Sequence, residues 1–287
     1  MRKIQAEAPK DYEFPSIWDF RMTAVSGIVF TISQIVLRKV CYFLFQPFCK
    51  ACPTEEEKAL RSGKAAYNMF KIIHFTGATV WGYYVLIDQP YFPKFLGGHG
   101  DLIHMFDGYP YQTHAYQLKE CLLILMGYHV GSLINHGIGA RRTDFLEMAL
   151  HHSVSVFLYG GSYLYNAWEI AGVIALIHDI ADITTSMIKV IAETDYKYTT
   201  VGIFLFHMGL WGYTRNYGLY HAICKIWEAQ PDFGTAFNLQ MYVFLLSCLL
   251  LLHYWWYYLF LKHLWKFIKK GSTENTMDKV QTDVKKV

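Results

Sequence analysis

Residues 151–182 read HHSVSVFLYGGSYLYNAWEIAGVIALIHDIAD, two apolar segments joined by a short polar region. Residues 160–166 hold the glycines, serine and asparagine that are typical of a tight turn. His152 lies thirteen residues before Tyr165, near the centre of this turn, and His178 lies thirteen residues after it. If both segments are helices, each histidine is about 20 Å from the turn. Two antiparallel neighbouring helices would therefore bring the two histidines to the same depth.

The same two segments carry further ionisable side chains at this depth. His151 stands beside His152, and Asp179 and Asp182 follow His178 closely. On a helix His178 and Asp182 are one turn apart and share a face, whereas Asp179 points about a quarter-turn away. A carboxylate bonded to an imidazole fixes its tautomer and raises its basicity, which suits a general base. We therefore predict that these five side chains form a catalytic constellation.

Two other interpretations of this constellation remain. The groups could be buried polar side chains that satisfy one another and lock two helices together. Three histidines and two aspartates could also ligate zinc or iron. The H-x-x-x-H and H-x-x-H-H patterns of membrane di-iron enzymes are absent from it, and the C-x-x-C pair Cys49 and Cys52 has no second pair to complete a zinc site. We expect neither a metal nor a resident cofactor.

Composition indicates a membrane protein. Of the 287 residues, 53% are hydrophobic and only 17% are charged, and the apolar residues come in blocks. Aromatic residues make up 17%, with many tyrosines and tryptophans, as expected where rings lie at membrane interfaces. The net charge of +3 is too small to suggest nucleic-acid binding, and no basic patch forms a suitable motif.

Seven apolar segments of roughly membrane length predict an all-α polytopic protein with about seven transmembrane helices. The first is the weakest, because Ser33 and Gln34 lie inside it. Thr54 followed by three glutamates predicts a capped start for an amphipathic helix over residues 54–64. The predicted spans cover residues 17–37, 66–87, 116–138, 147–163, 167–191, 200–226 and 239–268.

These segments divide the chain into three parts. Residues 1–63 hold the first span and the amphipathic linker, 64–268 form the main transmembrane domain, and 269–287 form a polar tail. Loops that are rich in lysine and arginine alternate along the chain with loops that are poor in both. This pattern puts the tail on the positive side and the N-terminus opposite, as an odd number of spans requires.

Other polar residues within the spans could line the same cavity. Most of them, taken singly, are more typical of helix packing. Arg215 differs, because an arginine deep in a span needs a partner, which an aspartate or a lipid or acyl-donor phosphate would supply. The set is His74, His129, Asn135, His136, His207, Arg215, Asn216 and His221.

The run from Arg142 to Lys189 resembles the Lag1 motif of ceramide synthases, the acyltransferases of the TRAM-Lag1-CLN8 (TLC) domain family. The similarity is extended, and the gap from the histidine pair to the His-Asp pair is that of the family. The looser resemblance covers residues 64–268. The matching positions are Arg142, Asp144, Phe145, Glu147, Met148, His151, His152, Ser155, Leu158, Ser162, Tyr163, Asn166, His178, Asp179, Asp182 and Lys189.

This resemblance implies a TLC-like helical bundle that transfers a fatty acyl group from acyl-CoA, a co-substrate, to a sphingoid-base amine and so makes ceramide. His152 would then be the reacting imidazole, either as a base or as an acyl acceptor. The CoA head would lie at the positive face near Arg141, Arg142 and Lys197. We expect the substrate-binding set to be Arg141, Arg142, Ser162, Tyr163, Asn166, Lys189 and Arg215. Glu169 departs from the pattern, since many members have a basic residue there, as does Ser186, where animal members often have Glu.

A second function class also fits the residues. The chain would then be a catalytically silent accessory subunit of a larger membrane complex that keeps a lipid in the cavity. The enzyme interpretation favours the endoplasmic reticulum, whereas the accessory interpretation favours the mitochondrial inner membrane. Expected partners are membrane lipids, acyl-CoA and sphingoid base, together with a homodimer or other membrane subunits. The sequence specifies neither the acyl-chain length nor the base.

Overall fold

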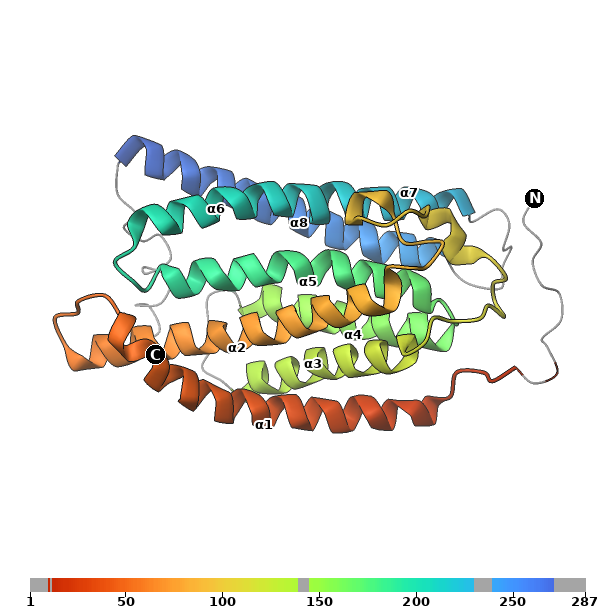
Figure 1. Ribbon diagram of the computed structural model, residues 1–287, viewed down its shortest axis with the longest axis horizontal. Helices are drawn as coiled ribbons and strands as arrows, with labels where there is room; N and C mark the ends of the chain where they lie inside the picture. Colours follow the sequence, from red (N-terminus) through yellow and green to blue (C-terminus); the bar gives the residue numbers. More distant parts are fainter. Residues whose placement is uncertain (1–9, 11, 139–144, 230–238, 271–287) are drawn as a thin grey trace.

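The computed structural model describes residues 10, 12–138, 145–229 and 239–270, and its regular elements there are helices (Figure 1). Short 3-10 helices flank α1 or lie in the loop after α2. A π-helical segment, η5, joins α6 to α7. The long elements are α1 (Phe20–Phe45), α2 (Glu55–Leu86), α3 (Leu118–Ile138), α4 (Phe145–Leu164), α5 (Trp168–Ile191), α6 (Lys197–Trp211), η5 (Gly212–Gly218), α7 (Leu219–Ala229) and α8 (Leu239–Lys270).

Four segments are long and apolar enough to cross a membrane: Ile17–Phe48, Leu118–Ile138, Trp168–Ile191 and Gln240–Lys269. The chain is thus an all-α membrane protein. The other three long rods are more polar or are interrupted. Charged and polar side chains occupy the first turns of α2 and the start and middle of α4, and η5 breaks the rod that α6 begins.

The helices follow the predicted apolar segments, with two differences. The Thr54 side chain accepts a hydrogen bond from the Glu57 amide at 3.2 Å, which confirms the predicted cap. The helix that starts there continues without a break to Leu86, so the predicted linker and second span are one rod. The predicted sixth span becomes α6, η5 and α7, because the backbone widens into a π-helix around Arg215. Such π segments are rare and frequently occur at functional sites.

Small residues let α1 lie close against α3. A Cβ atom added at Gly127 would lie 1.9 Å from Ser26 Oγ and 2.9 Å from the Thr23 carbonyl oxygen. Thr23 Oγ1 donates to the Leu123 carbonyl at 2.9 Å, and Asn135 bonds to Gln34 across the same interface. Close backbone approach and interhelical hydrogen bonds are the usual forces between helices in lipid. The polar residues that weaken the first predicted span therefore stabilise its packing.

Helix α5 lies at the centre of the bundle and contacts α2, α3, α4 and α6 (Figure 1). It is an apolar helix buried on most of its surface, with Val173, Leu176 and Ile177 almost fully enclosed. Its polar side chains are therefore held at defined positions between the other helices. This placement builds the site described below.

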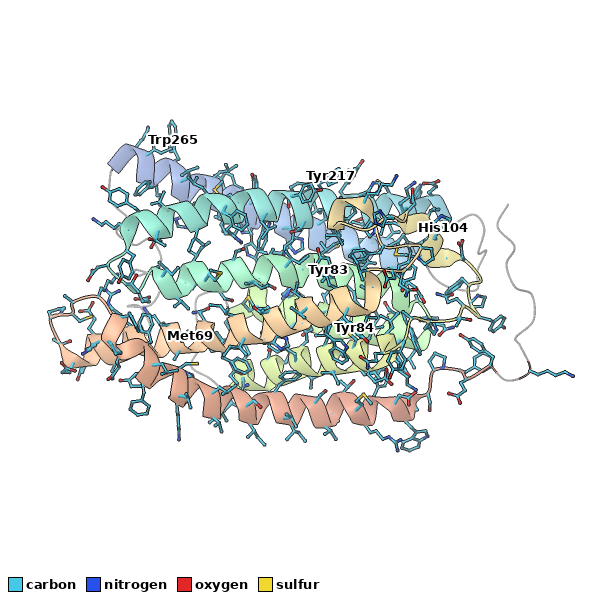
Figure 2. All side chains as sticks on the ribbon, viewed as in Figure 1. Met69, Tyr83, Tyr84, His104, Tyr217 and Trp265 are labelled. Atoms are coloured by element: carbon cyan, nitrogen blue, oxygen red, sulfur yellow. The ribbon has the colours of Figure 1, made fainter. Side chains whose placement is uncertain are left out.

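The loop between α2 and α3 covers one end of the bundle (Figure 1). Phe92 and Leu102, which belong to this loop, are fully buried. Tyr83 donates from its hydroxyl to the Leu96 carbonyl at 3.1 Å, which ties the loop to α2 (Figure 2). Gly100 is required here, because a Cβ atom would lie 2.0 Å from the Pro90 carbonyl oxygen.

Candidate functional site

The turn between α4 and α5 brings the two sets of ionisable residues together. Asn166 adopts a left-handed backbone with φ of 59°, a conformation that asparagine tolerates better than most residues. The chain thereby reverses within three residues, from Leu164 to Trp168, and α4 and α5 run antiparallel as neighbours. The sequence placed His152 and His178 at one depth. In the structure His178 and His151, the neighbour of His152, border the same cavity, whereas His152 does not.

This cavity lies among α3, α4, α5 and α8 and has a volume of about 40 Å³. That is room for about three water molecules. Its lining combines apolar side chains with histidine, aspartate, serine and tyrosine. The lining residues are His129, His151, Ser155, Leu158, Tyr159, Ala171, Ile174, Ala175, His178, Asp179, Asp182, Tyr242 and Leu249.

His178 has a defined tautomer. Its Nδ1 lies 2.6 Å from the Ile174 carbonyl oxygen, which can only accept a hydrogen bond, so Nδ1 carries the proton. Nε2 of the neutral ring is then an acceptor. This atom is buried and has no hydrogen-bond partner among the residues that the structure describes. A buried imidazole with a free lone pair beside a cavity is suited to removing a proton from a bound substrate.

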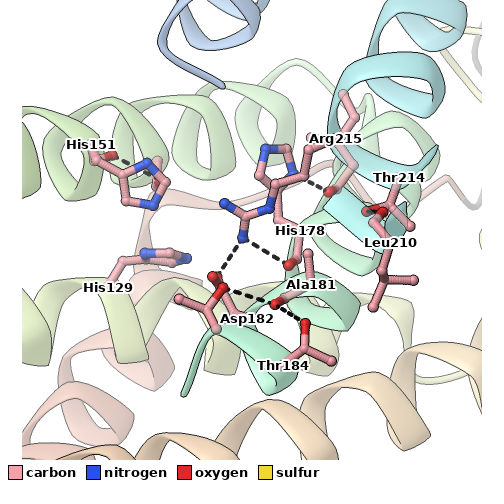
Figure 3. A network of polar contacts seen from close by, with 12 residues as sticks. His129, His151, His178, Ala181, Asp182, Thr184, Leu210, Thr214 and Arg215 are labelled. Carbon is pink, nitrogen blue, oxygen red and sulfur yellow. Dashed lines mark hydrogen bonds and ion pairs between the residues drawn. The ribbon is translucent and has the colours of Figure 1, made fainter. Parts of the chain in front are cut away.

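Asp182 pairs with Arg215, which answers the question that the sequence raised about this arginine. Arg215 Nη2 lies 2.6 Å from Asp182 Oδ2 and donates to the His178 carbonyl oxygen at 2.8 Å (Figure 3). The guanidinium also lies over the Trp211 ring, 4.2 Å from its centroid. Arg215 is only 2% exposed, so the pair is screened little by solvent. The interaction fixes the α5 backbone at the histidine itself.

His151 and His152 face different surroundings. His151 borders the cavity, and its Nδ1 is buried without a partner in the described part of the chain. His152 does not border the cavity. Its Nδ1 lies 3.1 Å from Nδ1 of His129 on α3, and the ring packs near Tyr128. His129 does line the cavity, as the sequence allowed (Figure 3).

Asp179 also borders the cavity and is 7% exposed. It lies apart from the Asp182–Arg215 pair, as its position on the helix predicts. Within the described ranges it makes no hydrogen bond or ion pair. Its carboxyl group is therefore available to a ligand in the cavity.

Ser162, Tyr163 and Asn166, predicted to bind substrate, lie toward the α4–α5 turn and outside the cavity lining. Ser162 bonds to the hydroxyl of Tyr242, which does line it. Tyr163 donates to Asp19 Oδ2 at 2.6 Å, which links α4 to the start of α1. These contacts make the first two of these residues part of the packing between helices.

Asn166 belongs to a second polar cluster, at the loop-covered end of the bundle. His114 Nε2 lies 2.8 Å from Asn166 Oδ1, and His114 Nδ1 lies 2.7 Å from Glu169 Oε1. The imidazole stacks on Trp168 at a centroid distance of 3.8 Å. Nearby, burial raises the pKa of the Tyr109 hydroxyl, which donates to the Tyr165 carbonyl at 2.9 Å. The cluster holds the turn against the loop.

Two of the remaining predicted residues lie at the opposite end of the bundle. Lys189 is exposed in the last turn of α5, and Lys197 is exposed at the start of α6. Both therefore lie at the end of the bundle where α5 finishes, well away from the turn (Figure 1). Arg141 and Arg142 lie outside the described residues.

Sequence reasoning missed two residues on α8. Tyr242 lines the cavity, and His253 is fully buried with its ring centre 4.9 Å from that of His178. Both lie on the inward face of the helix, at positions that otherwise hold leucine. His253 could have been singled out in the sequence, because it is a histidine that interrupts an apolar helix face. In the described part of the chain, no cluster of three or more histidine, cysteine, aspartate or glutamate side chains has the geometry to hold a metal ion.

The chain is similar to a known domain family over most of its length. The model of the TLC domain matches residues 64–262, which is more than half of the chain. The chain belongs to the TLC-domain family. The matched region of this TLC-domain protein begins inside α2 and contains the whole cavity lining.

Individual relatives of this TLC-domain protein share less than a third of its residues in the aligned regions. It is 28% identical to ceramide synthase 4 of Mus musculus over 203 residues, covering 67% of this chain and 52% of that protein. It is 29% identical to ceramide synthase 4 of Homo sapiens over 195 residues, covering 64% and 50%. It is 24% identical to sphingosine N-acyltransferase lag1 of Schizosaccharomyces pombe over 223 residues, covering 77% and 51%. The chain thus spans about half the length of these curated relatives.

Proposed function

We propose that this protein transfers a fatty acyl group from acyl-CoA to the amine of a sphingoid base, giving a ceramide and free CoA. The observation that carries the proposal is the free Nε2 of His178, set by the Ile174 carbonyl beside a cavity that also holds His151, Asp179 and Asp182. Membership of the TLC-domain family and similarity to ceramide synthases support it.

The chemistry requires a base, because the amine must lose a proton as it attacks the thioester carbonyl. His178 Nε2 is the group best prepared to accept it. Asp179, without another partner in the described chain, would bind the incoming ammonium group. Arg215 and Asp182 would hold the α5 backbone so that the imidazole keeps its position.

The two neighbouring histidines take different roles in this proposal. His151 borders the cavity and is the imidazole that could contact the acyl group or accept it transiently. His152, which the sequence favoured as the reacting group, would act through its contact with His129 and position the cavity wall. Trapping of an acyl-enzyme with hydroxylamine distinguishes a covalent route from direct attack.

The substrates would enter from the membrane. A cavity of about 40 Å³ holds only a few waters, so the helices around it must separate to admit an acyl chain. The CoA phosphates would bind at the end of the bundle that carries Lys189 and Lys197. Arg141 and Arg142 remain candidates from the sequence alone. We further propose that seven helical rods cross the bilayer, counting α6, η5 and α7 as one rod. The membrane would be that of the endoplasmic reticulum. The protein would act as a homodimer or with other membrane subunits.

The test is an acyl-transfer assay with the full chain, purified into lipid nanodiscs, using radiolabelled acyl-CoA and sphinganine. We expect ceramide formation by the unmodified protein and a loss of about 10²-fold or more in His178→Gln, the usual size of a general-base effect. His99→Gln, on the exposed loop, is the matched control and should retain full activity.

The same assay separates the two function classes. If the folded protein makes no ceramide with any acyl-CoA offered, the acyltransferase proposal is wrong. Mass spectrometry of lipid that copurifies with the inactive protein would then test the accessory interpretation. A lipid retained in stoichiometric amount, and lost in a variant that fills the cavity such as Ala175→Phe, would support it.

A further inference from the structure

His253 on α8 is a buried histidine that packs among aromatic rings, while its ring nitrogens lack well-formed hydrogen bonds within the described chain. Its side chain is fully buried, yet neither Nδ1 nor Nε2 makes a hydrogen bond of good geometry with the described residues, although the Arg215 backbone lies close to the ring. A neutral imidazole always carries one N–H donor and one acceptor. Buried polar atoms without partners are rare, and each one calls for a bound water, a ligand or a functional role.

His253 is a polar residue on an otherwise mostly apolar face of α8. The inward face of this helix runs through Tyr242, Leu246 and Leu249, and residue 253 is the next position along it. A leucine there would continue the apolar face without leaving any polar atom unpaired. The backbone at this position is held firmly, because Trp211 Nε1 donates to the His253 carbonyl at 3.4 Å and the two rings pack edge to face.

The surroundings of His253 belong to the proposed site. Its nearest ionisable neighbour is His178, with ring centres 4.9 Å apart, and His178 also has an unpartnered Nε2. Arg215 from η5 and His151 from α4 are the other charged or titratable groups that act on it, and Asp182 lies beyond Arg215. Arg215 Nε is likewise buried without a partner in the described chain. Within the described residues, unpartnered ring nitrogens of His178 and His253 and the Nε of Arg215 therefore belong to neighbouring side chains.

We propose that His253 is a second proton acceptor, which receives through His178 a proton that the substrate nitrogen gives up. This inference rests on the proposed acyl transfer. A sphingoid-base amine, like a lysine side chain, is an ammonium ion at neutral pH. On forming an amide it therefore loses two protons.

The proton balance explains why one imidazole is too few. The new C–N bond forms as the C–S bond of the thioester breaks, and the departing sulfur takes one proton to become the thiol of CoA. The other proton is released from the site. His178 Nε2 can hold only one proton at a time. When the first has moved on to His253, His178 is free to accept the second and deliver it to the sulfur.

The experiment compares steady-state kinetics of the unmodified protein, His253→Leu and His253→Gln in nanodiscs. The pH is varied between pH 6 and pH 9, where the fraction of substrate amine that has lost its first proton rises with pH. In His253→Leu we expect kcat to fall about 10²-fold with little change in KM for the base. We also expect the pH optimum to move upward. Without the second proton acceptor, the variant can use only the neutral amine, whose concentration rises with pH. The change in pH profile separates proton transfer from a packing defect.

His207→Leu is the matched control. His207 is also a buried histidine with an unpartnered Nε2 in the described chain, but its Nδ1 is hydrogen-bonded to Thr184 at 2.8 Å and its ring packs on Trp211 and Phe260. Its loss should lower the melting temperature and leave the pH profile unchanged. If His253→Leu does not fold, His253→Gln is judged by the same criteria.

The outcomes are distinct. Unchanged kcat and pH profile in a folded His253 variant would overturn the relay while leaving acyl transfer intact. The relay is also overturned if neither variant folds, since His253 is then needed for the bundle itself. An inactive unmodified protein would instead refute the proposed function.

Discussion

The ion pair between Asp182 and Arg215 supports a prediction at the scale of single residues. Asp182→Asn should destabilise the protein strongly, because it leaves the guanidinium of Arg215 buried without its counter-charge. Removing one member of a buried pair typically costs about 3–5 kcal/mol, and the partial exposure of the Asp182 side chain favours the lower end. Thermal unfolding in detergent would measure the loss.

The paired variant separates stability from function. Asp182→Leu combined with Arg215→Met removes both charges, so the melting temperature should recover most of what Asp182→Asn loses. Acyl transfer should not recover, because the His178 carbonyl loses its contact with Arg215. Full activity in the double variant would show that the pair serves stability alone.

Asn166 gives a prediction about backbone strain. Its φ of 59° is left-handed, and its side chain bonds to His114. Asn166→Gly loses only the side-chain contacts, whereas Asn166→Ala also strains the backbone by about 1–2 kcal/mol. We expect the alanine variant to unfold at a lower temperature than the glycine variant. Equal melting temperatures would mean that the turn carries no strain.

The residues of the candidate site were predictable only where their distance along the helix from a recognisable turn could be counted in the sequence. His151, His178, Asp179 and Asp182 lie at countable distances from one turn, and all four border the cavity. His253 had no such reference, because residues 230–238 separate α8 from the preceding helix by an interval of unknown depth. The different directions of His151 and His152 also depend on helix rotation, which packing sets and spacing alone does not.

At the scale of elements, the close contact of α1 with α3 predicts opposite effects for two glycines of one helix. Gly127→Val should destabilise the bundle by about 1–3 kcal/mol, because the side chain would overlap Ser26 and the α1 backbone. Gly137→Ala meets no atom within 4 Å and should be neutral or stabilising by up to about 1 kcal/mol. Melting temperatures of both variants test the interface, and similar values would contradict it.

The helices themselves were largely predictable, because each apolar segment is long and ends at a polar or proline-containing stretch. The merger of the 54–64 helix with the second span follows from packing: Ala65 and Ala66 are fully buried and nothing between them and Thr54 breaks a helix. The π-helical segment at residues 212–218 was not predictable. It surrounds Arg215, whose tertiary contacts periodicity does not reveal.

At the scale of the whole molecule, the number of membrane crossings can be decided by which residues share a side. With seven crossings, His104 lies on the side of Tyr165, at the loop-covered end, and Glu55 lies with Lys197 at the other end. If only the four apolar segments cross, the whole stretch between α1 and α3 stays on one side, and His104 lies with Glu55. His104 is therefore the residue that discriminates.

The measurement uses His104→Cys, Glu55→Cys and Tyr165→Cys, each in a cysteine-free background, in sealed vesicles treated with a membrane-impermeant thiol reagent. All three positions are exposed, and Figure 2 shows His104 at the opposite end of the bundle from Trp265 near the end of α8. We expect His104→Cys to be labelled together with Tyr165→Cys and not with Glu55→Cys. Labelling together with Glu55→Cys would mean that α2 does not cross. Because α2 packs along α5, which holds the catalytic candidates, such a result would also require water at the depth of the cavity.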